Sequence, residues 1–446
     1  MILRRFFSSS SCKSFLKKPQ YDVKRILENI PQYQTSIQNR ELIEAENITL
    51  DLQQLAERYQ HIKKIDKAIA DIQIQRKSIE AQIKGDRTKI TEYSAALKAL
   101  KEQYQDNDKE LSELKIKVLE TCESLPNLLD PTVPAKKPQV DQWINPLKEY
   151  ETSETRAHVD IMLKKKMLDL QTASNITGTS WYYLLNDGAR LEQALVSYAL
   201  KKANENGFAS CVPPSITKRE LIDACGFNPR DMNNEKQIYA LQDTNLGLVA
   251  TAEISMAGLG ANKVLDLNSA EGAKKLVGVS RCYRAEAGAR GKDTKGLYRV
   301  HEFTKVELFC WSKPENSSKI LEEIKQLQIS TVEELGLSAK VLNMPSNDLG
   351  NPAFKKYDIE AWMPGRGKFG EISSASNCTD FQGRRLNTKH KNGDTGKLEY
   401  VHTLNGTAMA VPRVMIALVE NFYDPSTDKI FIPECLREFM NGQQYI

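Results

Sequence analysis

The chain has 446 residues, of which 40% are hydrophobic and 7% aromatic, a composition that suits two or three soluble domains. The net charge of +4 is too small to indicate nucleic-acid binding by itself. Its eight cysteines form no C-x-x-C pair and do not cluster with histidine, so we expect neither a structural zinc nor a disulfide framework. No apolar run is long enough to span a bilayer, and we expect no membrane partner.

The first twenty residues differ from the rest of the chain. The stretch MILRRFFSSSSCKSFLKKPQ is basic, contains four consecutive serines and has no acidic residue. This composition is typical of a mitochondrial transit peptide and predicts a location in the mitochondrial matrix. A disordered basic tail is the alternative.

Residues 48–119 carry a coiled-coil pattern. Apolar residues recur at alternating spacings of three and four up to residue 83, and again from residue 90 after a break at 84–87. So short a break predicts a helix that folds back on its predecessor as a projecting arm. Its distal half is rich in basic residues, including Lys63, Lys64, Lys67, Arg76, Lys77 and Arg87. These charges suit contacts with RNA phosphates, although a dimerising coiled coil with a solvated face explains the heptads equally well.

The sequence then changes to mixed helix and strand. Residues 178–184 are predicted to form a strand, residues 188–206 a helix, and residues 211–214 a strand that ends in two prolines. Further on, we expect Thr251, Ala252 and Glu253 on a strand, where a hydroxyl and a carboxylate two residues apart share one face and can receive an ammonium group.

Residues 284–307, RAEAGARGKDTKGLYRVHEFTKVE, are the most informative segment. Residues 282–286 and 303–309 alternate with period two and predict an antiparallel pair joined by a polar turn. Arg284, Glu286 and Glu307 would then share one sheet face. This segment offers arginines for phosphate, Phe303 for an adenine ring and carboxylates for an ammonium group. A surface hairpin with cross-strand ion pairs is the alternative.

Two later segments also carry candidate functional residues. Residues 371–385, EISSASNCTDFQGRR, join a polar strand to a helix, and residues 404–421 join a strand and a small-residue turn to a helix that carries Arg413. Residues 365–370 match G-x-G-x-x-G, but no helix is expected after them, so we predict a turn between strands and not a dinucleotide site.

Together these segments resemble the three motifs of class II aminoacyl-tRNA synthetases, and their amino-acid sequences are similar to those of the seryl-tRNA synthetases. The resemblance implies an α+β fold, a class II antiparallel β-sheet flanked by helices, preceded by an N-terminal antiparallel α-helical coiled-coil arm. It divides the chain into a transit peptide at 1–20, a tRNA-binding domain at 21–135 with its arm at about 48–119, and a catalytic domain at 136–446. It also implies a homodimer through the helix-strand unit at 188–214.

The resemblance also implies residue roles. Arg284 and Arg413 would be catalytic. The ATP site would comprise Arg284, Ala285, Glu286, Arg299, Val300, Phe303, Glu371, Ile372, Ser373, Ser374 and Arg413. The serine site would comprise Thr251, Ala252, Glu253, Arg284, Glu307 and Thr407. Glu371 and Ser374 would contact Mg²⁺ carried with ATP.

The implied reaction forms seryl-adenylate from L-serine and ATP and transfers the seryl group to the 3′ end of serine tRNA. The sequence departs from the usual family pattern at Val249 and Ala250, where isoleucine and proline are common, and at Ala408 and Pro412. The competing hypothesis is a non-catalytic synthetase-like RNA-binding paralogue, which the intact arginines at 284 and 413 disfavour.

Overall fold

The computed structural model describes residues 14–42, 44–227, 237–285 and 296–446. Contacts divide the chain into two compact units, Gln20–Leu128 and Leu129–Ile446, and residues 14–19 belong to the second unit. The domain boundary that we predict at residue 135 stays a prediction. No helix in the described ranges is both long and apolar enough to cross a membrane.

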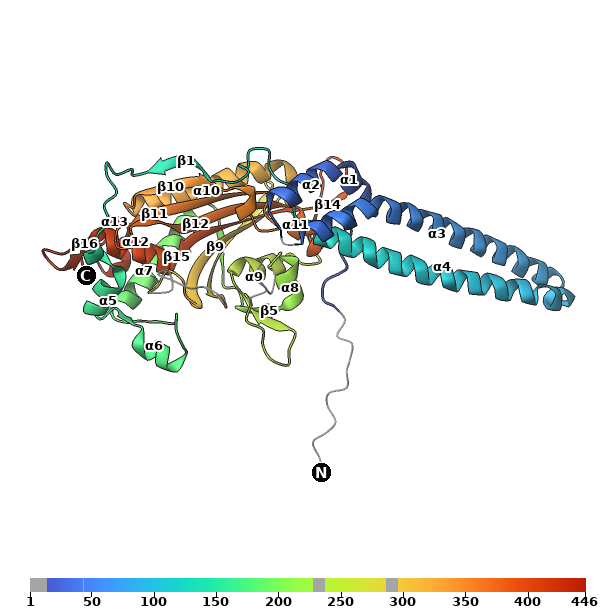
Figure 1. The fold of residues 1–446 in the computed structure, drawn as a ribbon, viewed down its shortest axis with the longest axis horizontal. Helices are drawn as coiled ribbons and strands as arrows, with labels where there is room; N and C mark the ends of the chain where they lie inside the picture. Colours follow the sequence, from blue (N-terminus) through green and yellow to red (C-terminus); the bar gives the residue numbers. More distant parts are fainter. Residues whose placement is uncertain (1–13, 43, 228–236, 286–295) are drawn as a thin grey trace, which may run out of the picture. The chain divides into compact units, whose positions relative to one another are not determined.

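The first unit is built on a long helical hairpin (Figure 1). Two short helices, α1 (Val23–Glu28) and α2 (Ile30–Asn39), precede α3 (Ala45–Gly85) and α4 (Ile90–Ser124). The predicted seam residues Ile48, Leu52 and Leu55 of α3 are buried together with Leu111 and Val118 of α4. At a rise of about 1.5 Å per residue, α3 is roughly 60 Å long. The predicted fold-back is confirmed: a 3₁₀ turn (Arg87–Lys89) joins the two helices.

The second unit contains an eight-stranded sheet in the order β1-β10-β11-β12-β15-β9-β8-β4. The strands are β1 (Gln139–Ile144), β4 (Ala209–Cys211), β8 (Ala273–Tyr283), β9 (Glu302–Ser312), β10 (Ala339–Asn343), β11 (Lys355–Met363), β12 (Lys368–Thr379) and β15 (His402–Ala410). Every neighbouring pair is antiparallel except β4 and β8. The expected α+β class with an antiparallel sheet flanked by helices is confirmed.

Period-two alternation gives the sheet two different faces. On β9, Val306, Leu308 and Cys310 join the main core with residues of α7 (Asp187–Glu205), α10 (Ser317–Glu334) and α12 (Val411–Phe422). The alternate residue Phe309 packs in a second core with residues of α8 (Arg219–Ala224) and α9 (Ala252–Gly258) and with Leu386, which directly follows α11 (Phe381–Arg385). The three long helices therefore leave one sheet face free for a site that smaller elements border.

The remaining elements are short. They are α5 (His158–Lys164), α6 (Gln171–Ile176), α13 (Glu434–Arg437), β2 (Leu168–Asp169), β3 (Tyr183–Leu184), β5 (Ile216–Lys218), β6 (Leu246–Leu248), β7 (Val264–Leu265), β13 (Lys389–Lys391), β14 (Leu398–Tyr400), β16 (Tyr423–Asp424) and β17 (Lys429–Ile430). The predicted turn at 365–370 is confirmed, because β11 and β12 flank it and pair with each other.

Four local predictions are wrong. The strand expected at 211–214 lies earlier in the chain, because β4 ends at Cys211. The strand expected at 178–184 shrinks to the two residues of β3. Thr251 is not on a strand but is the N-cap of α9, where its hydroxyl accepts a hydrogen bond from the Glu253 amide at 3.4 Å. The strand expected to run to residue 286 ends at Tyr283, because the Ala285 amide turns away to donate to the Gln237 carbonyl.

Candidate nucleotide and amino-acid site

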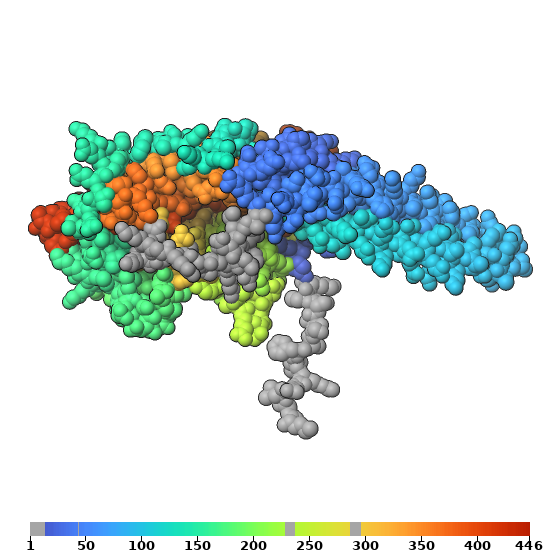
Figure 2. Space-filling model, viewed as in Figure 1, coloured from blue at the N-terminus to red at the C-terminus, as the bar shows by residue number. Residues whose placement is uncertain are grey.

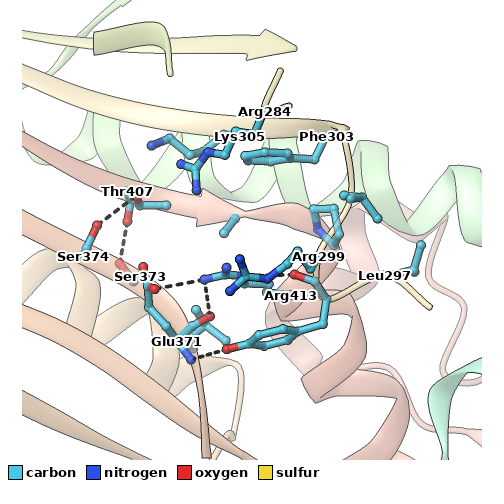
Figure 3. A pocket seen from close by; sticks show the side chains of 15 residues that line it. Arg284, Leu297, Arg299, Phe303, Lys305, Glu371, Ser373, Ser374, Thr407 and Arg413 are labelled. Atoms are coloured by element: carbon cyan, nitrogen blue, oxygen red, sulfur yellow. Dashed lines mark hydrogen bonds and ion pairs between the residues drawn. The ribbon is translucent and has the colours of Figure 1, made fainter. Parts of the chain in front are cut away.

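A pocket on the free sheet face gathers side chains from β9, β12, β15 and the start of α12 (Figure 3). Most of the residues predicted to bind ATP line it: Arg284, Arg299, Val300, Phe303, Glu371, Ile372, Ser373, Ser374 and Arg413, together with Thr407. Ala285 directly follows Arg284 without lining the pocket, and Glu286 lies outside the described residues. The sequence did not single out Leu297, Tyr298 and Lys305, which also line it.

Arg284 and Phe303 form one wall of the pocket. The register pairs Cys282 with Phe303, so Arg284, two residues beyond Cys282, projects from the same face as Phe303. The Arg284 amide still donates to the His301 carbonyl at 2.9 Å, which keeps Arg284 aligned with β9 beyond the strand end. Its guanidinium carbon lies 5.1 Å from the Phe303 ring centroid. A cation therefore lies beside an open aromatic face, a suitable arrangement for phosphate next to a purine.

A β-bulge brings Glu371 and Ser374 to the same face. Three residues apart on a regular strand they would point to opposite faces, but Ile359 pairs with Ser373 and Glu360 with Glu371, so Ile372 is the extra residue. The Ser374 hydroxyl lies 3.5 Å from that of Thr407. No group of three or more His, Cys, Asp or Glu within the described ranges could hold a metal ion.

Arg413 forms the opposite wall. It follows Pro412 in the first turn of α12, and its guanidinium lies 3.0 Å from the Glu371 carboxylate and donates to the Tyr298 carbonyl at 3.3 Å. Burial disfavours the charged form of Glu371, but Arg413, Lys356 and Arg284 outweigh it and lower its pKa. Glu371 is therefore an anion at neutral pH and balances the charge of these neighbouring cations.

A buried acidic cluster adjoins the pocket. Glu307 on β9 lies opposite Thr407 on β15 and forms an ion pair with Lys305. Glu253 accepts hydrogen bonds from Gln382 at 2.7 Å and from Asn405 at 2.9 Å. Both carboxylates are almost fully buried.

The close approach of α9 to the sheet creates this cluster. Gly278 on β8 lies opposite Glu307, and a Cβ there would lie only 3.0 Å from the Met256 sulfur of α9. Burial, together with the charge of Glu307, raises the pKa of Glu253 to about 7. Burial also raises the pKa of Glu307, although Lys305 and a hydrogen bond from Thr251 oppose that rise. A buried pair of carboxylates with a single lysine favours one further cation.

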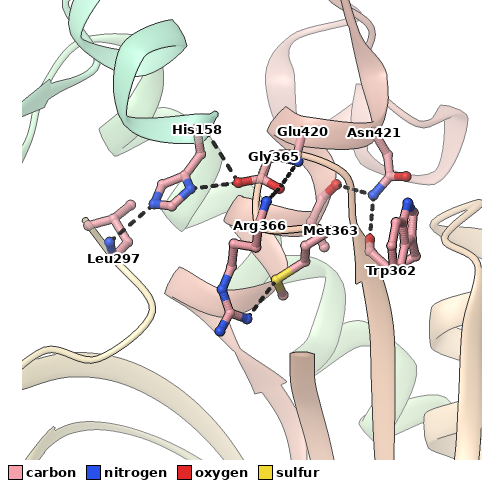
Figure 4. Close-up of polar contacts among 9 residues, drawn as sticks. His158, Leu297, Trp362, Met363, Gly365, Arg366, Glu420 and Asn421 are labelled. Atoms are coloured by element: carbon pink, nitrogen blue, oxygen red, sulfur yellow. Dashed lines mark hydrogen bonds and ion pairs between the residues drawn. The ribbon is translucent and has the colours of Figure 1, made fainter. Parts of the chain in front are cut away.

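A second polar network anchors the loop segment of residues 297–300 at Leu297 (Figure 4). The carboxylate of Glu420, buried on α12, accepts from the His158 ring Nδ1 at 2.7 Å and from the Gly365 and Arg366 amides at 2.8 and 3.2 Å. The Leu297 amide donates to His158 Nε2 at 3.3 Å, which places the ring proton on Nδ1. Glu420 therefore ties the turn at 365–370 to the pocket wall at Leu297.

Tyr298 links this network to the arginine wall. The Arg366 guanidinium carbon lies 3.3 Å and that of Arg413 4.6 Å from the Tyr298 ring centroid. The Tyr298 hydroxyl accepts from the Glu371 amide at 3.1 Å. Sequence reasoning missed this network because His158 and Glu420 are 262 residues apart, and no local pattern links them.

The basic residues predicted to contact RNA lie on α3 and its turn. Lys63, Lys64, Lys67, Lys77 and Arg87 are exposed, and Arg76 is half-buried beside Glu80. Figure 2 shows the surface of this hairpin in blue and cyan. The structure leaves these charges accessible to a partner.

Comparison with known proteins gives consistent matches. Residues 239–422 match the family model described as the tRNA synthetase class II core domain (G, H, P, S and T). The chain is 83% identical to the mitochondrial serine–tRNA ligase of Saccharomyces cerevisiae over 446 residues, which cover 100% of both chains. It is 38% identical to the serine–tRNA ligase of Borreliella afzelii over 95% of this chain and 99% of the relative.

Solved structures match over almost the whole chain. The seryl-tRNA synthetase of Pyrococcus horikoshii complexed with ATP superposes with a TM-score of 0.86 at 33% identity, covering 96% of this chain and 99% of that one. The cytoplasmic serine–tRNA ligase of Naegleria fowleri in complex with AMP gives a TM-score of 0.82 at 26% identity, covering 95% and 98%.

Proposed function

Since the chain belongs to the seryl-tRNA synthetases of class II and is a mitochondrial serine–tRNA ligase, we propose that the pocket between β9, β12, β15 and α12 binds ATP and the acidic cluster beside it binds serine. The observation that carries this proposal is the junction of the two regions. Arg284, Arg413 and Phe303 lie in the pocket, and the buried carboxylates of Glu253 and Glu307 adjoin them.

The charges of the two regions match the two substrates. Arg284 and Arg413 offset the charge that develops on the phosphates, while Glu253 and Glu307 receive the serine ammonium group. The serine carboxylate attacks the α-phosphorus of ATP and pyrophosphate leaves. A ribose hydroxyl at the tRNA 3′ end then attacks the seryl carbonyl, and AMP leaves. The side chains position the reactants and stabilise charge, and no covalent nucleophile is needed.

Thr407 supports selectivity for serine. Its hydroxyl is buried at the junction of the two regions, 3.5 Å from that of Ser374. A hydroxyl partner held there would be left unsatisfied by alanine, which should therefore be rejected strongly.

Glu371 and Ser374 are the residues that would contact Mg²⁺ carried by ATP. They share one face through the bulge at Ile372, and the lowered pKa of Glu371 keeps it anionic. An ionised carboxylate and a hydroxyl beside phosphate oxygens suit a hard cation. Mg²⁺ would offset phosphate charge there.

The hairpin α3–α4 is the element that we assign to serine tRNA. Its exposed lysines and Arg87 would contact backbone phosphates, which position an RNA without reading its sequence.

A homodimer through the α7–β4 region is supported by exposed apolar residues. Val212, directly after the edge strand β4, is 94% exposed, and Tyr183 and Leu185, which precede α7, are 42% and 40% exposed. Sedimentation of the purified chain with and without Val212→Asp tests this assignment, and a monomeric wild-type chain would contradict it.

Serine-dependent exchange of pyrophosphate into ATP tests the proposal as a whole. We expect exchange with L-serine and almost none with L-alanine. Absence of exchange with serine, ATP and Mg²⁺ would instead favour a non-catalytic RNA-binding protein, an alternative that none of the relatives named above supports.

A further inference from the structure

We propose that the segment Ser14–Lys17, here called the N-terminal strap, remains in the mature enzyme, that the leader is removed before Ser14, and that the strap braces the serine-binding region. The cleavage rests on the mitochondrial location and the brace on the proposed serine site, and separate experiments test the two. Composition alone assigns residues 1–20 to the leader, whereas contacts place the strap in the catalytic unit.

Glu220 on α8 is the main anchor of the strap. Its carboxylate accepts hydrogen bonds from the Ser14 hydroxyl at 2.5 Å, the Phe15 amide at 3.1 Å and the Leu16 amide at 3.4 Å. Burial works against the charged form of Glu220, but these donors prevail and lower its pKa. Three consecutive residues therefore donate to one ionised carboxylate, which orders the backbone at this point.

Asn262 and Lys218 also contact the strap. Asn262 donates to the Phe15 carbonyl at 2.8 Å and accepts from the Lys17 amide at 3.3 Å, so its amide pairs with the strap backbone in both directions. The Lys218 ammonium lies 5.0 Å from the Phe15 ring centroid. The Asn262 contacts involve backbone groups and fix the path of the chain, whereas Lys218 contacts the Phe15 side chain.

Leu16 connects the strap to the serine-binding helix. It packs against the core cluster that contains Ile254 and Ala257 of α9, and α9 begins at Thr251 and carries Glu253. Cleavage after Lys17 would remove this side chain and leave the Glu220 carboxylate without its three strap donors. A leader that ends before Ser14 still contains Arg4, Arg5 and Lys13, so targeting charge is retained in the part removed.

Mass spectrometry of the enzyme purified from mitochondria tests the cleavage position. We expect a first residue after Met1 and no later than Ser14. A first residue beyond Ser14, or an uncleaved Met1, would overturn the proposed cleavage.

Recombinant chains beginning at Ser14 and at Gln20 test the brace. In the longer chain, we expect slow hydrogen exchange at the amides of residues 15–17, a melting temperature higher by about 2–4 °C and a lower KM for serine. The ATP KM should be similar in both chains. Equal melting temperatures and equal serine KM values would refute the brace.

Point variants keep the strap present and test its anchor. Glu220→Gln in the chain that begins at Ser14 should speed amide exchange at residues 15–17 and raise the serine KM, whereas the exposed Glu149→Gln should change neither. Unchanged protection in Glu220→Gln would show that Glu220 does not hold the strap. Pyrophosphate exchange by the same proteins reports separately on the proposed function, because strap protection is measured without substrates.

Discussion

The pKa of Glu253 makes serine binding dependent on pH in a definite direction. Burial and the charge of Glu307 raise the Glu253 pKa to about 7. Only the ionised form attracts an ammonium group, so serine binding should weaken as the pH falls through this value. About a tenth of Glu253 is ionised at pH 6 and about nine-tenths at pH 8, which makes binding about tenfold weaker at pH 6, or about 1.4 kcal/mol.

The stability of the empty enzyme should change in the opposite direction. A carboxyl with a raised pKa binds its proton more tightly in the folded than in the unfolded chain, so its contribution is present at low pH and is lost as the pH rises. Between pH 6 and pH 8 this carboxyl alone should lower the free energy of unfolding by about 1.4 kcal/mol. Opposite trends in affinity and stability separate titration of Glu253 from general acid damage.

The assay is the serine KM in pyrophosphate exchange between pH 6 and 8.5, with calorimetric titration of serine in two buffers of different ionisation enthalpy. We expect proton release on binding that decreases above pH 7. Glu253→Gln, which retains an acceptor without the charge, should raise the serine KM and remove its pH dependence while the ATP KM changes little. A serine KM that is flat from pH 6 to 8 in the wild type would refute the reasoning.

Three further predictions concern other parts of the chain. Arg284→Ala should reduce adenylate formation at least about a hundredfold without unfolding the protein. Its control is Arg281→Ala, at a side chain that is 48% exposed, which should change activity little. Near-normal pyrophosphate exchange by Arg284→Ala would show that Arg284 does not bind phosphate. Glu420→Gln leaves buried donors unsatisfied and should lower the free energy of unfolding by about 3–5 kcal/mol. It should also raise the ATP KM more than the serine KM. Equal changes in the two KM values would contradict a role for Glu420 in positioning Leu297. Replacing the lysines at 63–67 by alanine should raise the tRNA KM and leave serine activation unchanged. The slope of log KM for tRNA against log salt concentration should decrease by about 0.9 for each RNA phosphate that is no longer neutralised. An unchanged slope would argue against phosphate binding by these lysines.

Patterns within single elements were predictable from the sequence. The heptads left a dimerising coiled coil open, and the short break at 84–87 predicted the hairpin, whose two helices bury their apolar stripes against each other. The alternation of residues 303–309 predicted β9 and the face that Arg284 shares with Glu307. The turn at 365–370 followed from the missing helix after its glycines.

Features that depend on tertiary contacts were not predictable. The bulge at Ile372 is set by pairing with β11, and strict alternation would have separated Glu371 from Ser374. Thr251 was predicted to lie on a strand, and its own backbone is extended, at φ −163° and ψ 150°, but its hydroxyl caps the start of α9. Lys305 was missed because its role depends on the burial it shares with Glu307, which a local pattern does not report.

The division of charge between the two regions explains how the substrates are oriented before they react. Serine is a zwitterion, so in the proposed site its ammonium group would be drawn to Glu253 and Glu307, while its carboxylate would face Arg284, a residue that lines the pocket and lowers the pKa of Glu307. The triphosphate would lie near the same arginine and Arg413. Fixed charges would thereby direct the carboxylate oxygen toward the α-phosphate, without rearrangement at the moment of reaction. Below a pH of about 7 a proton on Glu253 offsets part of the buried negative charge, and we expect serine binding to release it because the ammonium group would supply the positive charge instead.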